Sequence, residues 1–527
     1  MKNNSLYNLK PKIIKIFNLL TFLILIISSL IFFEKNFFIQ IDIFNFISSR
    51  TWRWCFLIDL YSLIFSLIVL IITIFIFFYS LSYLETEGEK PKFFISLFIF
   101  IISMIILIYS FNLTSLLIRW DGLGVTSFLL IFFYHSIKRK NSSLITIILN
   151  RIGDLIIIFS LTLSLIYFTW NIIFWFSCQK LTIIMLLIAS FRKSAQIPFS
   201  AWLPLAIAAP TPVSSLVHSS TLVTAGIYLI FRIPYRCLFN FKKLIFLISR
   251  ATLLLRSFIA LQRFDLKEII AFSTIRHISL IIIGLSWDYF NISFFHLCTH
   301  ALFKALLFIC SGFLIYFQWG SQDIRNLSLI QIRPKIKFAF IIASCSIMGL
   351  PFLSGFYSKD ILIDLSSTSR TIIIFSLSIL ITRIYSLRLL FYLSNSKSNL
   401  KIKINEFINK TIYIILWFSI FAGSVIQWSL FSLSFTTYLQ TLKFLIFIIF
   451  IFRLLIIIYK IKINFNFIYY LRTIWKVNFF LIKFSSCFNI LEKGWLYLPV
   501  KILSNCQNYQ WKFQILSWSI MLIFLFF

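Results

Sequence analysis

The sequence predicts an all-α protein that crosses a membrane many times, and three observations support this fold class. Hydrophobic residues make up 60% of the 527 residues. The mean hydropathy of +0.96 lies far above that of water-soluble globular proteins. Apolar runs of membrane-spanning length recur along the chain, and they are continuous rather than alternating with polar residues. Continuous runs indicate membrane helices and exclude the strands of a membrane barrel.

The apolar runs predict about fifteen membrane helices. Most runs are uninterrupted: 13–33, 56–80, 93–111, 113–136, 144–168, 213–231, 244–262, 293–316, 371–393, 411–436, 441–459 and 511–527. Three candidates contain proline or charged residues and predict interrupted helices: 181–199, 266–285 and 336–366. No polar stretch between them is long enough for a soluble domain, so we expect one membrane domain with a tail.

The pattern changes in the tail, over residues 461–510, where Lys, Arg and Asn are interleaved with Phe, Tyr, Trp and Ile. This segment is amphipathic and too polar to span comfortably, so it predicts a helix lying along the membrane interface. The apolar run 511–527 would anchor its far end.

The net charge of +33 raises the question of nucleic-acid binding. The 49 Lys and Arg are scattered through short loops and the C-terminal third, which instead favours contact with the membrane surface and anionic lipid. We therefore expect no nucleic-acid partner. Because nearly every loop is basic, charge does not set the orientation of the helices.

The eight cysteines include no CxxC pair and no zinc-like grouping, so we interpret them as packing residues without disulfides. The first apolar run is too long for a signal-peptide core and lacks a small-residue cleavage site, so we expect no removable leader. Phe is abundant, with 66 copies, and Gly is scarce, with 12, which suggests an AT-rich organelle genome.

The most informative stretch places His296, His300 and Lys304 at helical spacing inside an apolar run. A charged side chain at the bilayer centre costs roughly 2.5–3.5 kcal/mol on insertion scales, so such a face needs a compensating role. The usual role is a buried path for protons or ions. Zinc also uses two histidines at this spacing, but no Glu follows His296 and no third ligand is evident, so we expect no metal.

Other ionisable residues also lie in or beside apolar runs: Asp59, Asp121, Asp154, Lys193, His218, Lys267, Lys359 and Asp360. Asp121 precedes Gly122 and Gly124, which allow a close helix neighbour, and we expect its partner on another helix. Asp154 has Arg151 within one turn, so a packing ion pair and a functional role both stay open.

Prolines mark the predicted interruptions. Lys193 lies about one turn before Pro198, with Pro204 following, and proline removes a helical hydrogen bond. Pro351 marks a second break. Transporters keep ion sites at such breaks. His218 follows a proline cluster, and it is either a relay group or a hydrogen-bonded packing histidine. We find no P-loop, dinucleotide fingerprint, nucleophile elbow or cysteine set for an iron–sulfur cluster.

Seven strings, in this order along the chain, carry a family resemblance: 120–124, 150–154, 193–204, 208–226, 265–274, 296–312 and 348–360. Together they resemble the chain 5 family of NADH:ubiquinone oxidoreductase, the mitochondrial form of respiratory complex I, over roughly residues 56–395. The resemblance implies an antiporter-like subunit with two inverted five-helix repeats, each with a broken helix. It implies proton pumping without redox chemistry in this chain.

The resemblance also implies a division of the chain. Residues 1–92 would hold the N-terminal helices, 93–243 and 244–395 the two half-channel repeats, and 396–460 additional helices. Residues 461–510 would form a lateral helix that braces neighbouring antiporter-like subunits, and 511–527 the anchor. NADH, FMN, iron–sulfur clusters and ubiquinone would belong to other subunits, with none in this chain. The implied location is the mitochondrial inner membrane, with cardiolipin as a plausible anionic lipid.

Residue roles follow from the resemblance position by position. Asp121 takes the acidic position of the first half-channel and Lys193 its partner, so we expect the two to form a switchable pair. His218 would bridge to His296, His300 and Lys304, and Lys359 would be the exit residue. Asp154, Lys267 and Asp360 would be supporting charges.

Three departures from the family pattern concern this site. Many relatives carry Glu where Asp121 stands, and Asp reaches less far towards Lys193. Relatives usually have small or amide residues where this chain has Arg276 and His277, and small residues at Ser249-Arg250. These added positive charges weaken the case for Lys267 as a relay member. Two alternatives remain open: a stand-alone cation/proton antiporter component, and a structural membrane subunit whose charges only pack helices.

Overall fold

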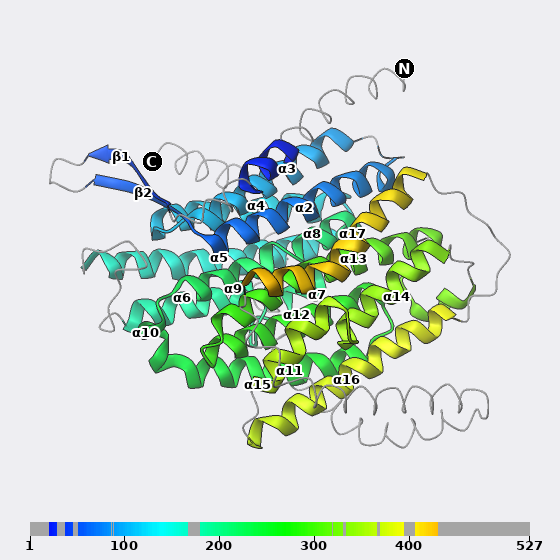
Figure 1. Cartoon of the computed structure of the whole chain (residues 1–527). Coiled ribbons are helices and arrows are strands. Elements are labelled where there is room, and N and C mark those ends of the chain that lie inside the picture. Colours follow the sequence, from blue (N-terminus) through cyan, green and yellow to red (C-terminus); the bar gives the residue numbers. More distant parts are fainter. Residues whose placement is uncertain are drawn as a thin grey trace, which may run out of the picture. The chain divides into compact units, whose positions relative to one another are not determined.

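The computed structural model describes residues 20–28, 37–45, 51–85, 87, 89–166, 180–318, 320–329, 334–365, 369–394 and 406–430. Long helices packed side by side make up most of this part of the chain (Figure 1). The expected spans 441–459 and 511–527 and the amphipathic segment 461–510 lie outside the described residues, as do Cys178, Cys487 and Cys506.

Eight helical segments in the described part are long and apolar enough to cross a membrane. They are α2 (Leu60–Tyr83), α3 (Lys90–Tyr109), α4 (Leu113–Phe132), α5 (Ile137–Ile166, spanning over Arg139–Ser164), the α8–α9 pair (Thr211–Arg232), α11 (Lys242–Gln262, with the preceding turn), α12 (Leu266–Ser286) and α13 (Phe290–Phe317). They confirm the runs predicted at 93–111, 113–136, 144–168, 244–262 and 293–316, and the chain is a multi-pass membrane protein. Two expectations are wrong: α12 is continuous where an interruption was expected in 266–285, and the run 213–231 is divided between α8 and α9. The candidate 181–199 contains only the short helix α6.

The remaining described elements are shorter or carry more charge. They are α6 (Lys180–Lys193), α7 (Trp202–Ala206), α8 (Thr211–Val217), α9 (Leu222–Arg232), α10 (Tyr235–Leu238), η2 (Phe239–Phe241), η3 (Ile324–Leu329), α14 (Pro334–Met348), η4 (Phe356–Asp360), α15 (Ile361–Leu365), α16 (Ser369–Ser394) and α17 (Glu406–Leu430). The helices expected at 371–393 and 411–436 are present as α16 and α17.

An antiparallel hairpin corrects the all-α prediction near the N-terminus. Strands β1 (Phe37–Asn45) and β2 (Thr51–Ile58) pair with Phe37 opposite Ile58. From residue 39 to 42 the sequence alternates Ile, Gln, Ile and Asp, the period-2 pattern of a strand, and the flanking residues are aromatic. Helix α2 therefore begins at Leu60, where Asp59 and Ser62 form a capping box, rather than at residue 56.

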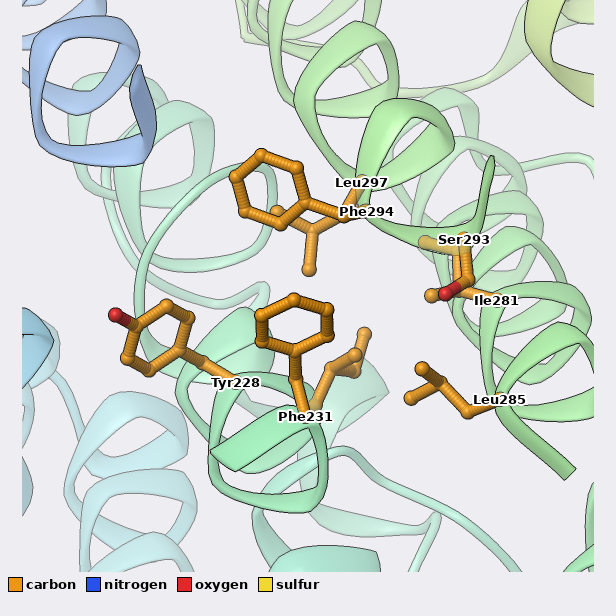
Figure 2. Close-up of a pocket in the computed structure, with 8 residues that line it drawn as sticks. Tyr228, Phe231, Ile281, Leu285, Ser293, Phe294 and Leu297 are labelled. Atoms are coloured by element: carbon orange, nitrogen blue, oxygen red, sulfur yellow. The ribbon is translucent and has the colours of Figure 1, made fainter. Parts of the chain in front are cut away.

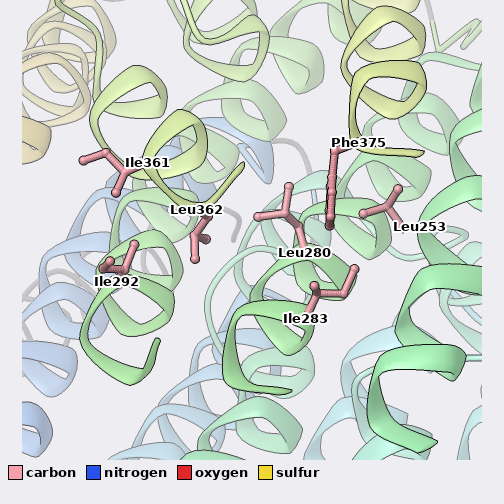
Figure 3. Packing of buried hydrophobic residues seen from close by; sticks show 7 residues of the cluster. All are labelled: Leu253, Leu280, Ile283, Ile292, Ile361, Leu362 and Phe375. Atoms are coloured by element: carbon pink, nitrogen blue, oxygen red, sulfur yellow. The ribbon is translucent and has the colours of Figure 1, made fainter. Parts of the chain in front are cut away.

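Helices α12 and α13 and the α8–α9 pair are the interior of the described bundle, because the most apolar window of each is wholly buried inside the protein. Helix α13 contacts α2, α8, α12, α14 and α17. An apolar cluster holds α12 and α13 against α11, α15 and α16 (Figure 3). Its members are Leu253, Leu280, Ile283, Ile292, Ile361, Leu362 and Phe375. Polar side chains on α12 and α13 are thus shielded from lipid.

Two helical segments are interrupted where the sequence carries proline. Helix α6 ends at Lys193 and α7 begins at Trp202, so Pro198 lies in the connection and Pro204 in the first turn of α7, where proline is tolerated. Helix α14 ends at Met348, and Pro351 lies before the π-helical turn η4. Gly349 follows α14 with a φ of +81°, a conformation that glycine adopts without strain.

Candidate functional site

The first group of charges joins α4 to α5. The Arg151 guanidinium lies 2.7 Å from Asp121 Oδ1 and 3.6 Å from Asp154 Oδ2, so one cation bridges both carboxylates. This confirms the expected partner of Asp154 and places the partner of Asp121 on another helix. The Asp121 side chain is 36% exposed and that of Asp154 only 8%, so the inner carboxylate is the less solvated one.

Lys193 lies at the C-terminal end of α6 and is 1% exposed. Its Nζ donates to the carbonyl oxygen of Trp120 at 3.0 Å and lies 3.9 Å from the centre of the Trp120 indole ring. The structure therefore brings Lys193 to the residue before Asp121 and not to its carboxylate. The direct ion pair expected between Asp121 and Lys193 is not formed in this structure. The short Asp121 side chain is instead turned to Arg151.

Arg192 fixes the end of α6 against α5, a contact that the sequence analysis missed. Its Nη1 and Nη2 donate to the backbone and side-chain oxygens of Asn150 at 3.0 and 2.8 Å. A Cβ at Gly153 would meet the guanidinium of Arg192, so a larger residue here would require the Arg192 side chain to shift. The sequence did carry a signal for this contact, because Arg192 is a second cation in the apolar run, directly beside Lys193. Arg192 positions Lys193 at the break in the helix.

Three basic side chains converge on the irregular segment between α7 and α8. His218 hydrogen-bonds to the backbone at Ala206, and Lys267 Nζ donates to the Ala209 carbonyl at 3.2 Å. Arg139 Nε donates to the Ala208 carbonyl at 2.9 Å. His218 and Lys267, which are far apart in sequence, therefore approach the same short stretch of backbone.

His296, His300 and Lys304 are wholly buried on α13, one above the other. The Lys304 ammonium donates to the Ser273 hydroxyl of α12. His296 Nδ1 lies 2.9 Å from Ser358 Oγ in the π-helical turn η4. His296 is thereby linked to Ser358, the residue directly before Lys359.

Lys359 closes the end of α14. Its Nζ donates to the carbonyl oxygens of Ile347 and Met348 at 3.0 and 3.3 Å, which are among the last carbonyls of that helix. Asp360 lies over Gly349, where a Cβ would be 3.2 Å from the carboxylate. The predicted exit residue and its neighbouring acid thus both contact the second helix break.

His277 and Arg276 belong to this central cluster, although the sequence pattern indicated them only as added charge near Lys267. His277 Nδ1 lies 3.2 Å from His296 Nε2. Arg276 is wholly buried beside the Tyr385 hydroxyl of α16. A sequence signal did exist: His277 is four residues after Ser273, so both lie on the face of α12 that meets α13.

Asp59 forms a structural ion pair instead of joining either cluster. Arg232, at the end of α9, contacts both of its carboxylate oxygens at 2.5 and 2.8 Å. Asp59 also accepts from the Ser62 backbone N–H as the N-cap of α2. Burial tends to raise the pKa of Asp59, but Arg232 and Ser62 outweigh it and lower this pKa below its ordinary value.

A small apolar pocket lies between α9, α12 and α13 (Figure 2). It is lined by Ile227, Tyr228, Phe231, Ile281, Leu285, Ser293, Phe294 and Leu297. The Tyr228 hydroxyl points away from it in Figure 2 and donates to the Ile108 carbonyl at 2.8 Å. The Ser293 hydroxyl donates to the Phe290 carbonyl at 2.7 Å, so both hydroxyls of the lining are held by backbone and the pocket supplies packing.

Comparisons with known proteins agree with this architecture. Residues 110–384 match the family described as NADH:quinone oxidoreductase/Mrp antiporter, TM. Residues 45–94 match the family described as NADH-Ubiquinone oxidoreductase (complex I), chain 5 N-terminus. The first match alone spans more than half of the chain.

Curated relatives extend the match. NADH-ubiquinone oxidoreductase chain 5 of Locusta migratoria is 39% identical over 409 residues, which cover 74% of this chain and 71% of the relative. The protein of the same name from Anopheles arabiensis is 42% identical over 352 residues, which cover 65% of this chain and 91% of the relative.

Solved structures show the same fold at lower identity. The structure of the Mrp complex from Dietzia sp. DQ12-45-1b aligns with a TM-score of 0.68 and 23% identity, covering 77% of this chain and 47% of that chain. The membrane-bound sulfane sulfur reductase, an archaeal respiratory membrane complex, aligns with a TM-score of 0.70 and 17% identity. The alignment covers 79% of this chain and 90% of that chain. The chain belongs to the NADH:quinone oxidoreductase/Mrp antiporter family and, within it, to the complex I chain 5 proteins.

Proposed function

We propose that this chain is a proton-translocating membrane-arm subunit of respiratory complex I, the complex in which NADH is oxidised by ubiquinone. The relatives' name, NADH-ubiquinone oxidoreductase chain 5, supports membership of that complex. One structural observation carries the proton-pumping role: ionisable groups centred on His296 and Lys304 are wholly buried on an interior helix, and His296 is linked through Ser358 to the second helix break.

The path would begin at the charges around Lys193. In the observed arrangement Arg151 holds Asp121 and Asp154, and within the described residues the direct contacts of Lys193 are a carbonyl and an indole ring, with no carboxylate in ion-pair contact. A buried ammonium without a carboxylate is poorly compensated for its lost hydration, whereas a nearby carboxylate favours it. A charge change in a neighbouring subunit could weaken or strengthen the ion pairs of Arg151 with the two carboxylates. Lys193 would then gain or lose its proton.

From Lys193 the proton would pass through His218 to Lys304, His300 and His296, and leave by Lys359. Asp154, Lys267 and Asp360 would tune the neighbouring charges. Moving one charge against the membrane potential costs about 2.3 kcal/mol per 100 mV, and a change of a few pKa units in one buried group is comparable to this cost.

The setting of the subunit follows from the same proposal. Redox chemistry with NADH, FMN, iron–sulfur clusters and ubiquinone would take place in other subunits. Its partners would be the other membrane subunits of the complex, with residues 93–243 and 244–395 as inverted half-channel repeats. We place it in the mitochondrial inner membrane, encoded by the organelle genome and in contact with anionic lipid such as cardiolipin.

The test is NADH-driven proton translocation in sealed membrane vesicles that carry Lys193→Ala, after assembly of the complex has been verified. Lys180→Ala is the matched control, because Lys180 is exposed at the other end of the same helix. We expect Lys193→Ala to abolish or strongly lower pumping and Lys180→Ala to leave it unchanged. Unaltered pumping by an assembled Lys193→Ala complex would remove Lys193 from the path and favour a structural role.

A further inference from the structure

We propose that His277 is an additional proton-carrying residue, which links His300 to His296 in the central cluster. This inference rests on the proposed proton path, and it assigns a step that the path through α13 alone lacks. It makes the junction a set of three imidazoles from two helices, with His277 on α12 and the other two on α13.

Ring distances place His277 between the two α13 histidines. The centre of its ring is 5.4 Å from that of His296 and 5.5 Å from that of His300, whereas the His296 and His300 rings are 6.4 Å apart. All three side chains are wholly buried. A proton going from His300 to His296 therefore has two shorter steps by way of His277 in place of one longer step.

The ring nitrogens fit this order. His277 Nδ1 is 3.2 Å from His296 Nε2, and His296 Nδ1 is 2.9 Å from Ser358 Oγ. Within the part of the chain that the structure describes, His277 Nε2 and both nitrogens of His300 have no hydrogen-bond partner. Buried polar atoms are nearly always paired, so two adjacent imidazoles with unpaired nitrogens indicate a contact that forms when the rings turn.

Proton balance is simple, because an imidazole can accept at one nitrogen and release from the other. A proton from a His300 nitrogen would bind at His277 Nε2, and the proton on Nδ1 would pass to His296 Nε2. His277 ends neutral as the Nε2–H tautomer, so in the next transfer the turned ring accepts at Nδ1 and releases the Nε2 proton to His296. His296 then releases from Nδ1 towards Ser358, next to Lys359. The reverse order uses the same contacts.

Charged neighbours keep protons from accumulating at this junction. Arg276 adjoins His277 on α12, Lys304 lies on α13 and Lys359 on η4, all within electrostatic reach of the histidines. Their positive charge disfavours a second proton on the cluster. Arg276 is also a large side chain that is wholly buried. Arg276 fills the space beside His277. Water in that space could otherwise carry protons past His277.

A purely structural role is the competing explanation, because the His277 ring also packs 5.6 Å from the Phe303 ring. His277→Gln separates the two explanations. The amide keeps the approximate size and can still hydrogen-bond to His296, but it does not accept and release a proton. A structural role survives this change, whereas a proton-carrying role does not.

The experiment measures protons translocated per NADH oxidised in sealed vesicles with the assembled complex, together with the solvent deuterium isotope effect on coupled NADH oxidation. His277→Gln is compared with His296→Gln and with His135→Gln, a control at an exposed position outside the cluster. We expect fewer protons per NADH and a changed isotope effect for the first two variants, and no change for the control.

Each other outcome has a distinct meaning. If His296→Gln lowers the ratio and His277→Gln leaves both readouts unchanged, His277 carries no proton, and the proposed function stands. If both variants pump normally, the proposed path through this cluster is wrong as well. If His277→Gln fails to assemble, His277→Asn is measured in the same way. Failure of both to assemble beside a normal His135→Gln would assign His277 a structural role.

Discussion

At the scale of single residues, backbone carbonyls hold the three lysines closest to the helix interruptions. Lys193 donates to Trp120, Lys267 to Ala209, and Lys359 to the end of α14. A carbonyl accepts a charge-assisted hydrogen bond from an ammonium and a weaker one from a neutral amine, so loss of the proton leaves no unpaired carboxylate behind. This distinguishes the three lysines from Arg232, whose partner is the carboxylate of Asp59.

Lys359→Arg tests this distinction. Arginine retains the charge and can still donate to the carbonyls of Ile347 and Met348, but it does not release its proton in proteins. We expect a complex that assembles and oxidises NADH while translocating fewer protons per NADH. The ratio is measured in vesicles beside Lys335→Arg, an exposed lysine in the first turn of α14. Normal pumping by Lys359→Arg would show that the residue acts only as a helix cap.

Asp59→Asn is predicted to weaken the structure and not the proton path. Asn caps a helix about as well as Asp, so the change isolates the lost pair with Arg232. Removing one partner of a buried pair costs roughly 3–5 kcal/mol, and we expect the lower half of this range because both side chains keep some exposure. Thermal unfolding in detergent should show the loss, while the pumping ratio of the assembled fraction stays normal. A lowered ratio would place Asp59 in the path.

The same pair predicts how stability depends on pH. Because the pKa of Asp59 is lower in the folded protein than its ordinary value, its contribution is complete above that ordinary value and declines as pH falls through the folded pKa. Acid unfolding curves of the unchanged protein and Asp59→Asn should therefore differ at neutral pH and converge in strong acid. A constant difference down to the lowest pH would contradict this assignment.

At the scale of elements, close packing keeps the interrupted helix α6 in place. A Cβ at Gly226 of α9 would lie 2.6 Å from the Ser190 carbonyl, in the last turn of α6, and 2.9 Å from the Ser194 nitrogen. Helix α9 therefore packs directly against the backbone at the end of α6, where Lys193 lies. The fit leaves no space for even a methyl group.

Gly226→Ala should displace this helix end. Overpacking of this kind typically costs about 1–3 kcal/mol, and a shift of Lys193 would reduce pumping as well as thermal stability. Gly122→Ala is the control, because its added Cβ would meet only Ser103 Cβ at an ordinary 3.5 Å. Measuring melting temperature and proton ratio for both variants tests the packing. Equal behaviour of the two would contradict it.

Elements with a strong local signal could be predicted from sequence. Long continuous apolar runs such as 113–136 and 293–316 gave correct helices, and prolines 198 and 351 lie where helices are interrupted. The hairpin of β1 and β2 was missed, because its high apolar content concealed the alternation from Ile39 to Asp42. The lateral helix stays a prediction, since residues 461–510 lie outside the described part of the chain.

The candidate site could be predicted only as a set of residue types. The apolar sequence around Lys193, His296 and Lys304 predicted that these side chains are buried, and they are. Spacing on one helix does not show which residues another helix brings near. Ser358 meets His296 from 62 positions away, and His277 meets it from α12. The partner of Asp121 depended on how α4 and α5 pack, and it is Arg151.

At the scale of the whole molecule, ionisable groups are concentrated where lipid and water are excluded. Lys304 and the three clustered histidines lie on two helices whose most apolar windows are wholly buried. Burying them among apolar side chains is costly, and a protein with only structural needs could place Leu or Met there. The energy spent on burying these groups is understandable if protons move through the interior of the subunit.

The most direct test of this central claim is the number of protons translocated per NADH by the assembled complex carrying Lys304→Met. Methionine has nearly the length of lysine but no ionisable group, and Lys180→Met at an exposed site is the matched control. We predict that Lys304→Met lowers the ratio and that Lys180→Met does not. We also predict that an imposed proton gradient inhibits NADH oxidation less in Lys304→Met than in the control. An assembled Lys304→Met complex with an unchanged ratio would contradict proton transfer through the centre of this subunit.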